Sequence, residues 1–80
     1  MDTLTIIFKH EVDSINCQWK LSSMGYKYPF GNPKDFTGLT LILVDLKDKT
    51  LFEGSDDKKD YGPKFEYSEW ETLCKILKNE

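Results

Sequence analysis

The sequence predicts an α+β fold, in which a small antiparallel sheet of four to five strands carries one C-terminal helix packed on one face. Three observations support this prediction. Apolar and polar residues alternate in the first half of the chain, whereas the segment that begins at Ser68 repeats its apolar residues at helical spacing. The chain has 80 residues, the size of one small domain, so residues 1–80 are expected to share one core.

The N-terminal region is predicted to form a hairpin. Residues 3–9 alternate as a half-buried strand does, and so do residues 15–22. The apolar face of the first strand carries Leu4, Ile6 and Phe8. The apolar face of the second carries Ile15, Cys17, Trp19 and Leu21. Residues 10–14 have the polar composition of a turn and are expected to join the two strands.

The middle of the chain contains the strongest core signal. Residues 39–46 are apolar on both faces, which favours a central strand with neighbours on either side. Residues 47–49 are predicted to turn the chain, and residues 50–53 to return as a short partner strand that ends at Gly54.

The C-terminal segment is predicted to be an amphipathic helix. Ser68 and Glu71 have the spacing of a capping box, in which each side chain bonds the backbone N–H of the other residue. The apolar positions Trp70, Leu73, Cys74 and Leu77 share one helical face. The core is therefore expected to contain Trp19, Leu41, Leu43, Trp70, Leu73 and Leu77.

Composition limits the classes of partner. The chain has 14 acidic residues against 11 lysines, lacks arginine and alanine, and has a net charge of −3. An acidic domain is repelled by nucleic acid and by anionic lipid, and it suits a basic protein surface. No run of about 18 apolar residues and no cleavable leader occurs, so a cytoplasmic protein without membrane contact is expected. The missing arginine and alanine suggest an AT-rich source, such as a phage or mobile element.

Residues suited to catalysis are few. His10, Cys17 and Cys74 fall in no nucleophile or metal-ligand motif, and both cysteines are expected to be reduced and buried. A Cys–His pair assembled in space stays open, because sequence spacing does not reveal such pairs. The acidic run 56–60 matches no calcium loop and is interrupted by lysines, which favours a solvated loop. The sequence therefore predicts no enzyme, no cofactor, no metal and no catalytic residue.

Two segments are candidates for binding. Residues 23–38 are rich in aromatic residues, glycine and proline, and long irregular loops in small domains are often functional. Their aromatic residues could anchor a protein partner, stack on single-stranded nucleic acid, or fold back over the sheet. The residues expected to face a partner are Tyr26, Tyr28, Phe30, Phe36, Asp56, Asp57 and Asp60.

Small size, acidity and an aromatic loop together favour a non-enzymatic protein-binding module. It is expected to be a small inhibitor or regulator of the anti-defence, immunity or antitoxin type, which occludes a basic surface of a larger protein. The alternative is a single-stranded nucleic-acid binder that uses the aromatic loop 26–36. Pairing of an exposed strand edge with a second copy leaves a homodimer open.

Three short stretches carry a resemblance to a known family. They are Trp19-Lys20-Leu21-Ser22-Ser23, Val44-Asp45-Leu46-Lys47-Asp48 and Tyr67-Ser68-Glu69-Trp70. In their order and motifs they resemble the BldB-like family of small actinobacterial regulators. The chain departs from that pattern where Leu21 interrupts the first motif and where the second lacks arginine. The resemblance implies a small partner of a helix-turn-helix regulator and no catalytic residue.

Overall fold

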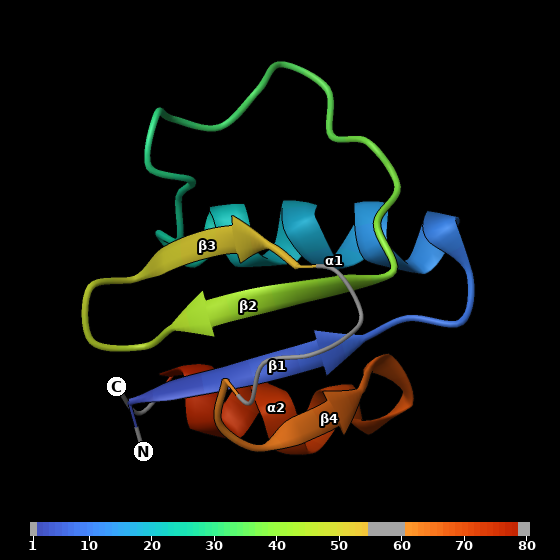
Figure 1. Ribbon diagram of the computed structural model, residues 1–80, viewed down its shortest axis with the longest axis vertical. Coiled ribbons are helices and arrows are strands. Elements are labelled where there is room, and N and C mark those ends of the chain that lie inside the picture. The colour runs from blue at the N-terminus through green and yellow to red at the C-terminus, as the bar shows by residue number, and fades with distance from the viewer. Residues whose placement is uncertain (1, 55–60, 79–80) are drawn as a thin grey trace.

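The computed structural model describes residues 2–54 and 61–78 (Figure 1). In chain order the elements are β1 (Thr3–Ile7), α1 (Glu11–Ser23), β2 (Leu41–Asp45), β3 (Thr50–Glu53), β4 (Lys64–Glu66), the single 3-10 turn η1 (Tyr67–Glu69) and α2 (Trp70–Lys78). This arrangement confirms the α+β class, a sheet within the predicted four to five strands, and the C-terminal helix. The acidic residues Asp56, Asp57 and Asp60 lie outside the described residues.

The four strands form one mixed sheet in the order β3-β2-β1-β4. Strand β2 pairs antiparallel with both β1 and β3, whereas β4 runs parallel to β1, so the expectation of a wholly antiparallel sheet is wrong at this edge. The chain reaches β4 by crossing from one edge of the sheet to the other, and it arrives in the direction of β1. Thr5 holds this crossing: its N–H donates to the carbonyl of Pro63, and its hydroxyl donates to that of Tyr61.

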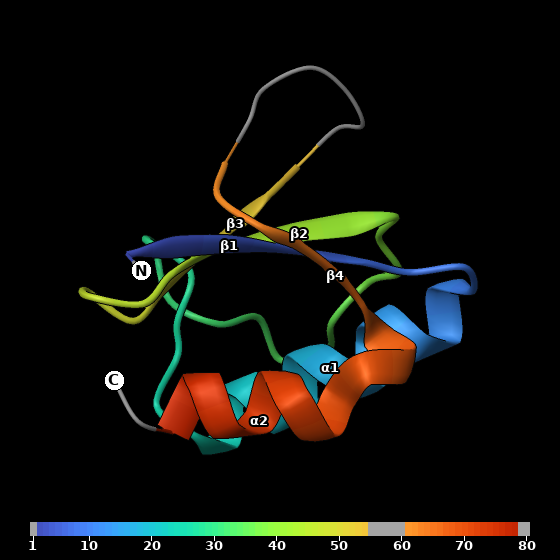
Figure 2. The same cartoon turned by 90° about the horizontal axis from the view of Figure 1, so that it is seen from below.

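Both helices cover the same face of the sheet, which makes a two-layer domain (Figure 2). The strand residues that point into this layer are buried, and the prediction for the apolar face of β1 is confirmed. They are Leu4, Ile6, Phe8, Ile42, Val44, Leu46 and Leu51. Leu41 and Leu43, which were expected in the core, are only half-buried on the opposite face. Both faces of β2 are apolar, and alternation alone does not say which face the helices cover.

The prediction of a turn over 10–14 and a strand over 15–22 is wrong, because residues 11–23 form α1. The buried positions of α1 are Ser14, Cys17, Gln18 and Leu21, which have the i, i+3, i+4, i+7 spacing of a helical stripe. Glu11 and Asp13 in the first turn suit the positive end of the helix dipole. Trp19, expected in the core, therefore lies away from that stripe and is 50% exposed.

The C-terminal helix is present, but it begins differently from the prediction. Ser68 lies inside η1, and the N-cap position before this turn is occupied by Glu66 without a side-chain cap, so the capping box is not formed. Leu73 and Leu77 are buried as predicted, whereas Trp70 is half-buried. The two helices meet at Lys20, whose Nζ donates to Tyr67 Oη at 2.7 Å and lies 5.0 Å from the Trp70 ring.

The state of the cysteines and the length of the helices can also be compared with the sequence predictions. Both cysteines are free thiols, and Cys17 is buried as predicted, whereas Cys74 is half-buried. No helix within residues 2–54 and 61–78 has the length and apolar character needed to cross a membrane.

Candidate functional site

The loop between α1 and β2 is fastened to the edge of the sheet. Lys27 pairs in parallel with Thr50 of β3: its N–H donates to Lys49 O at 3.0 Å, and its carbonyl accepts from Leu51 N–H at 2.9 Å. Pro29 has no N–H for the next rung, so the pairing ends there. The loop then turns away from β3 and leaves the end of that strand open.

A β-turn places one aromatic side chain fully in solvent. Gly31 N–H donates to Tyr28 O at 2.8 Å, which puts Pro29 and Phe30 at the two corners of the turn. Gly31 has a φ of 94°, a conformation that suits glycine. Phe30, at the second corner, is fully exposed. The turn therefore presents this side chain instead of burying it.

Asn32 holds this turn against the end of α1. Its Oδ1 accepts from Tyr28 N–H at 3.0 Å, and its Nδ2 donates to Ser22 Oγ at 3.1 Å and to Tyr26 O at 3.2 Å. One amide side chain thus joins the helix to both sides of the turn, which fixes the position of Phe30 relative to α1.

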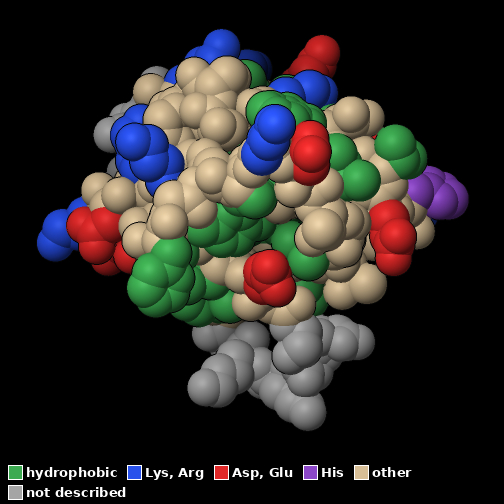
Figure 3. All heavy atoms as spheres, turned by 90° about the horizontal axis from the view of Figure 1, so that it is seen from above, with side chains coloured by type: hydrophobic (Ala, Val, Ile, Leu, Met, Phe, Trp, Pro, Cys, Tyr) green, Lys and Arg blue, Asp and Glu red, His purple; other side chains and the backbone are tan. Residues whose placement is uncertain are grey.

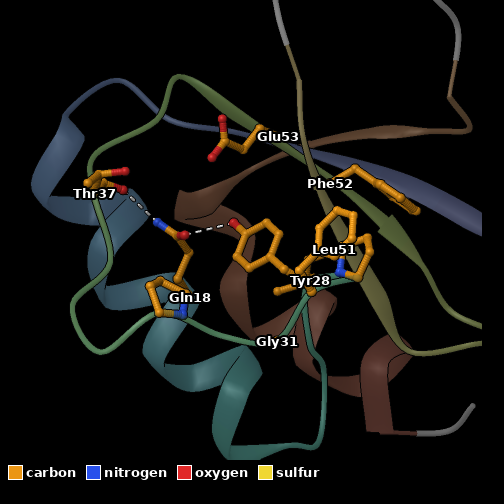
Figure 4. Close-up of a pocket in the computed structure, with 10 residues that line it drawn as sticks. Gln18, Tyr28, Gly31, Thr37, Leu51, Phe52 and Glu53 are labelled. Atoms are coloured by element: carbon orange, nitrogen blue, oxygen red, sulfur yellow. Dashed lines mark hydrogen bonds between the residues drawn. The ribbon is translucent and has the colours of Figure 1, made fainter.

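Gln18 connects the same loop to the middle of α1 (Figure 4). Its buried Nε2 donates to Ser14 O at 3.1 Å and to Thr37 O at 2.9 Å, and its Oε1 accepts from Tyr28 Oη at 2.7 Å. Ser14 adds a further tie, because its hydroxyl accepts from Leu39 N–H at 2.7 Å. These bonds explain why α1 buries polar side chains on its inner stripe: they satisfy the backbone of the loop.

The four aromatic residues expected to face a partner have different positions. Tyr26 is fully buried, and its hydroxyl donates to Leu77 O at 3.2 Å. Phe36 is 7% exposed and packs against Trp19, with ring centroids 4.9 Å apart, and against Tyr28. The idea that the loop folds back over the core therefore describes Tyr26 and Phe36. Tyr28 is half-buried and Phe30 is exposed, so only these two aromatics of the set reach the surface.

We define the loop face as the surface formed by Trp19, Tyr28, Pro29, Phe30 and Glu53. Figure 3 looks onto this side of the molecule, where hydrophobic side chains gather in the middle and both acidic and lysine side chains lie around them. A pocket of about 330 Å³ opens between the turn and the end of β3, lined among others by Tyr28, Phe30 and Glu53. The carboxylate of Glu53 extends towards the side of the pocket that holds the Tyr28 hydroxyl (Figure 4).

The surroundings of Tyr28 make its hydroxyl harder to ionise. Burial raises the pKa of Tyr28 to about 12, and the negative charges of Glu53 and of ionised Cys17 add to the rise. The protonated hydroxyl donates its hydrogen bond to Gln18 Oε1. Gln18, Trp19 and Glu53 were absent from the predicted site, because their closeness to the loop depends on the helical form of α1 and on the pairing of β3.

The remaining reactive side chains do not form a catalytic pair. His10 is exposed at the N-cap of α1, and Cys17 lies two turns further along that helix, about 10 Å along the axis. Burial raises the pKa of the Cys17 thiol to about 12, the opposite of what a nucleophilic cysteine needs. Among the residues that the structure describes, no group of three or more histidine, cysteine or acidic side chains is placed to hold a metal ion.

Alkaline pH is expected to destabilise the protein, beginning with Cys17. Its thiol has an ordinary pKa of 9.0, which burial raises to about 12 against the opposing charge of Lys20. The unfolded chain therefore releases this proton first, so the stabilising contribution is complete below pH 9 and is lost as the pH rises towards 12. The melting temperature of Cys17→Ala should begin to fall at a higher pH than that of the wild type. Identical profiles in the two proteins would contradict this assignment.

No family model, curated protein or solved structure matches this chain. The resemblance to the BldB-like regulators therefore stays a prediction, and the loop face is the feature of the molecule that bears most directly on function.

Proposed function

We propose that this protein is a binding module that docks on a larger protein through the loop face. The observation that supports the proposal most is Phe30, a large apolar side chain held fully in solvent at the corner of a hydrogen-bonded turn. Full burial of a phenylalanine side chain is favourable by about 1.5–3 kcal/mol, and the isolated protein does not gain this free energy at Phe30. A partner that covers Phe30 would recover that energy.

The loop face is suited to binding because it is ordered before any partner arrives. The side chains of Asn32 and Gln18 take part in five hydrogen bonds that hold the loop in place. Those of Gln18 join the loop to α1, and those of Asn32 join the turn to Tyr26 and to Ser22 of α1. Binding to an ordered loop costs less conformational entropy than binding to a loose one. Aromatic anchors at the centre of an interface commonly provide most of its affinity.

The charge of the chain supports a basic partner. A net charge of −3 attracts a positively charged surface and speeds the encounter with it. Asp56, Asp57 and Asp60 are expected from the sequence to contribute to this attraction. By covering a basic surface of its partner, the protein would act as a small inhibitor or regulator without chemistry of its own.

The proposal predicts that partner capture depends on Phe30 and not on exposed apolar residues in general. Tagged wild-type protein, Phe30→Ser and Val12→Ser are compared in pull-downs from a lysate of the source cells, with nuclease treatment, and the captured proteins are identified by mass spectrometry. Val12 is the matched control, because it is 60% exposed on α1 at a distance from the turn. One dominant partner should be retained by wild type and Val12→Ser and lost by Phe30→Ser.

Two results would contradict the proposal. Equal capture by all three proteins would exclude the loop face as the contact surface. Recovery of nucleic acid alone, or of proteins that disappear after nuclease treatment, would favour the single-stranded nucleic-acid alternative. The burial of Tyr26 and Phe36 weighs against that alternative, because it removes two of the four rings on which bases would stack.

A further inference from the structure

The pocket beside Phe30 contains one charged side chain. Among the described residues that line it, Glu53 alone carries a charge at neutral pH. The ion pair found within residues 2–54 and 61–78 joins Lys9 to Glu66, so no described cation neutralises Glu53. Glu53 is exposed to solvent, and a carboxylate that no described cation neutralises beside a mostly apolar pocket favours a cationic ligand.

The hydrogen bonds of Gln18 and Tyr28 also favour a ligand that donates to this pocket. Both protons of Gln18 Nε2 are used by the carbonyls of Ser14 and Thr37, and the Tyr28 hydroxyl donates its proton to Gln18 Oε1 (Figure 4). The oxygen of Tyr28 retains lone pairs and, like the carboxylate of Glu53, can only accept a hydrogen bond from a ligand. These side chains therefore match a group that donates several hydrogen bonds.

The walls of the pocket favour a flat cation. Tyr28, Pro29, Phe30 and Pro33 are among the residues that line it, and Tyr28 and Phe30 are aromatic. A guanidinium group is planar, weakly hydrated and able to stack on an aromatic ring while it donates to a carboxylate, whereas an ammonium group is compact and strongly hydrated. The arrangement of rings and acceptors thus fits arginine better than lysine.

We propose that this pocket receives an arginine side chain of the protein partner, with its guanidinium donating to Glu53 and Tyr28 and stacked against the Phe30 turn. The inference rests on the proposed function, since it names the chemistry of the partner at the same face. This chain contains no arginine, so neither another segment of the chain nor a second copy supplies the ligand.

The proposal is tested with three blocked tripeptides, Gly-X-Gly, in which X is arginine, lysine or citrulline. Each is titrated into the full-length 15N-labelled protein, and amide shifts are followed by NMR. Arginine peptide should shift Gly31, Phe52 and Glu53 in a saturable way. Citrulline has nearly the same shape without the charge and should bind about threefold to fivefold more weakly. Lysine should also bind more weakly than arginine.

Two variants assign the effect to the pocket. Glu53→Gln removes the carboxylate charge with little change in shape and should weaken binding of the arginine peptide about threefold to fivefold, as the loss of an exposed ion pair does. Glu71→Gln makes the same charge change at an exposed position of α2 and should leave binding unchanged. Equal binding of arginine and citrulline, or shifts outside the pocket only, would overturn the proposal.

The arginine proposal and the docking proposal can fail independently of each other. If Phe30→Ser abolishes partner capture while the arginine peptide leaves the pocket unshifted up to tens of millimolar, the docking surface stands and the arginine assignment fails. If the peptide binds through Glu53 but capture is unaffected by Phe30→Ser, the pocket recognises guanidinium while the docking model fails.

Discussion

Replacing Leu73 with alanine is expected to lower the free energy of unfolding by about 2–5 kcal/mol. Leu73 is fully buried in α2, within the layer between the helix and the sheet. Its truncation removes apolar contacts and leaves a cavity that the two packed layers cannot close. A domain of this size has a core that contributes only about 3–5 kcal/mol of net stability, so the variant should be largely unfolded at room temperature.

Leu43→Ala is the matched control for this prediction. Leu43 has the same side chain, but it lies half-buried on the sheet face opposite the helices. Water can fill the space that its truncation leaves, so a cost of roughly 1–2 kcal/mol is expected. Urea denaturation followed by circular dichroism measures both variants. Equal losses, or a larger loss for Leu43→Ala, would show that the helix-covered face is not the main core.

The sheet was largely predictable because its strands carry their pattern locally. The extended segment at the N-terminus buries Leu4 and Ile6 on the expected face, and residues 50–53 form β3 with the expected bounds. The parallel strand β4 was not foreseen. It is only three residues long, and its partner β1 lies about 60 residues earlier in the chain, so no local signal indicates the pairing.

Helix α1 was misread because its inner stripe contains polar residues. A helix that buries Ser14 and Gln18 lacks the apolar repeat by which helices are recognised, whereas Ile15, Cys17 and Trp19 alternate like a strand. These polar side chains form hydrogen bonds with the backbone of the loop that covers them. Those bonds join residues distant in sequence, so no local pattern reveals them. The acidic first turn, with Glu11 and Asp13, was the available signal for a helix.

The candidate site was half predictable for a related reason. Aromatic residues in a loop with glycine and proline pointed to the right segment, and the structure leaves Phe30 exposed there. Whether a ring is buried depends on contacts with distant residues. Tyr26, for example, is buried with its hydroxyl bonded to the carbonyl of Leu77. Glu53 joins the site only because β3 pairs with the loop at Lys27, a contact between segments more than 20 residues apart.

Replacing Gly62 with alanine is expected to cost roughly 2–5 kcal/mol, as much as the loss of a core leucine. Gly62 has a φ of 79°, where a residue with a Cβ is strained by about 1–2 kcal/mol. A Cβ at this position would also collide with the backbone oxygen of Thr3 and lie 2.7 Å from its carbonyl carbon. Relieving that overlap must move the chain away from β1, next to the pairing of β1 with β4, and overpacking of this kind costs about 1–3 kcal/mol.

Gly25→Ala separates the two causes of this loss. Gly25 also has a positive φ, 94°, but a Cβ there would meet nothing within 4 Å. Its variant should therefore show the conformational strain alone, about 1–2 kcal/mol. A clearly larger loss for Gly62→Ala in urea denaturation would assign the difference to the contact with Thr3, and hence to the crossing that brings β4 beside β1. Equal losses would mean that the backbone near Thr3 can yield, and that the residues leading into β4 are held less firmly than the hydrogen bonds of Thr5 to Tyr61 and Pro63 indicate.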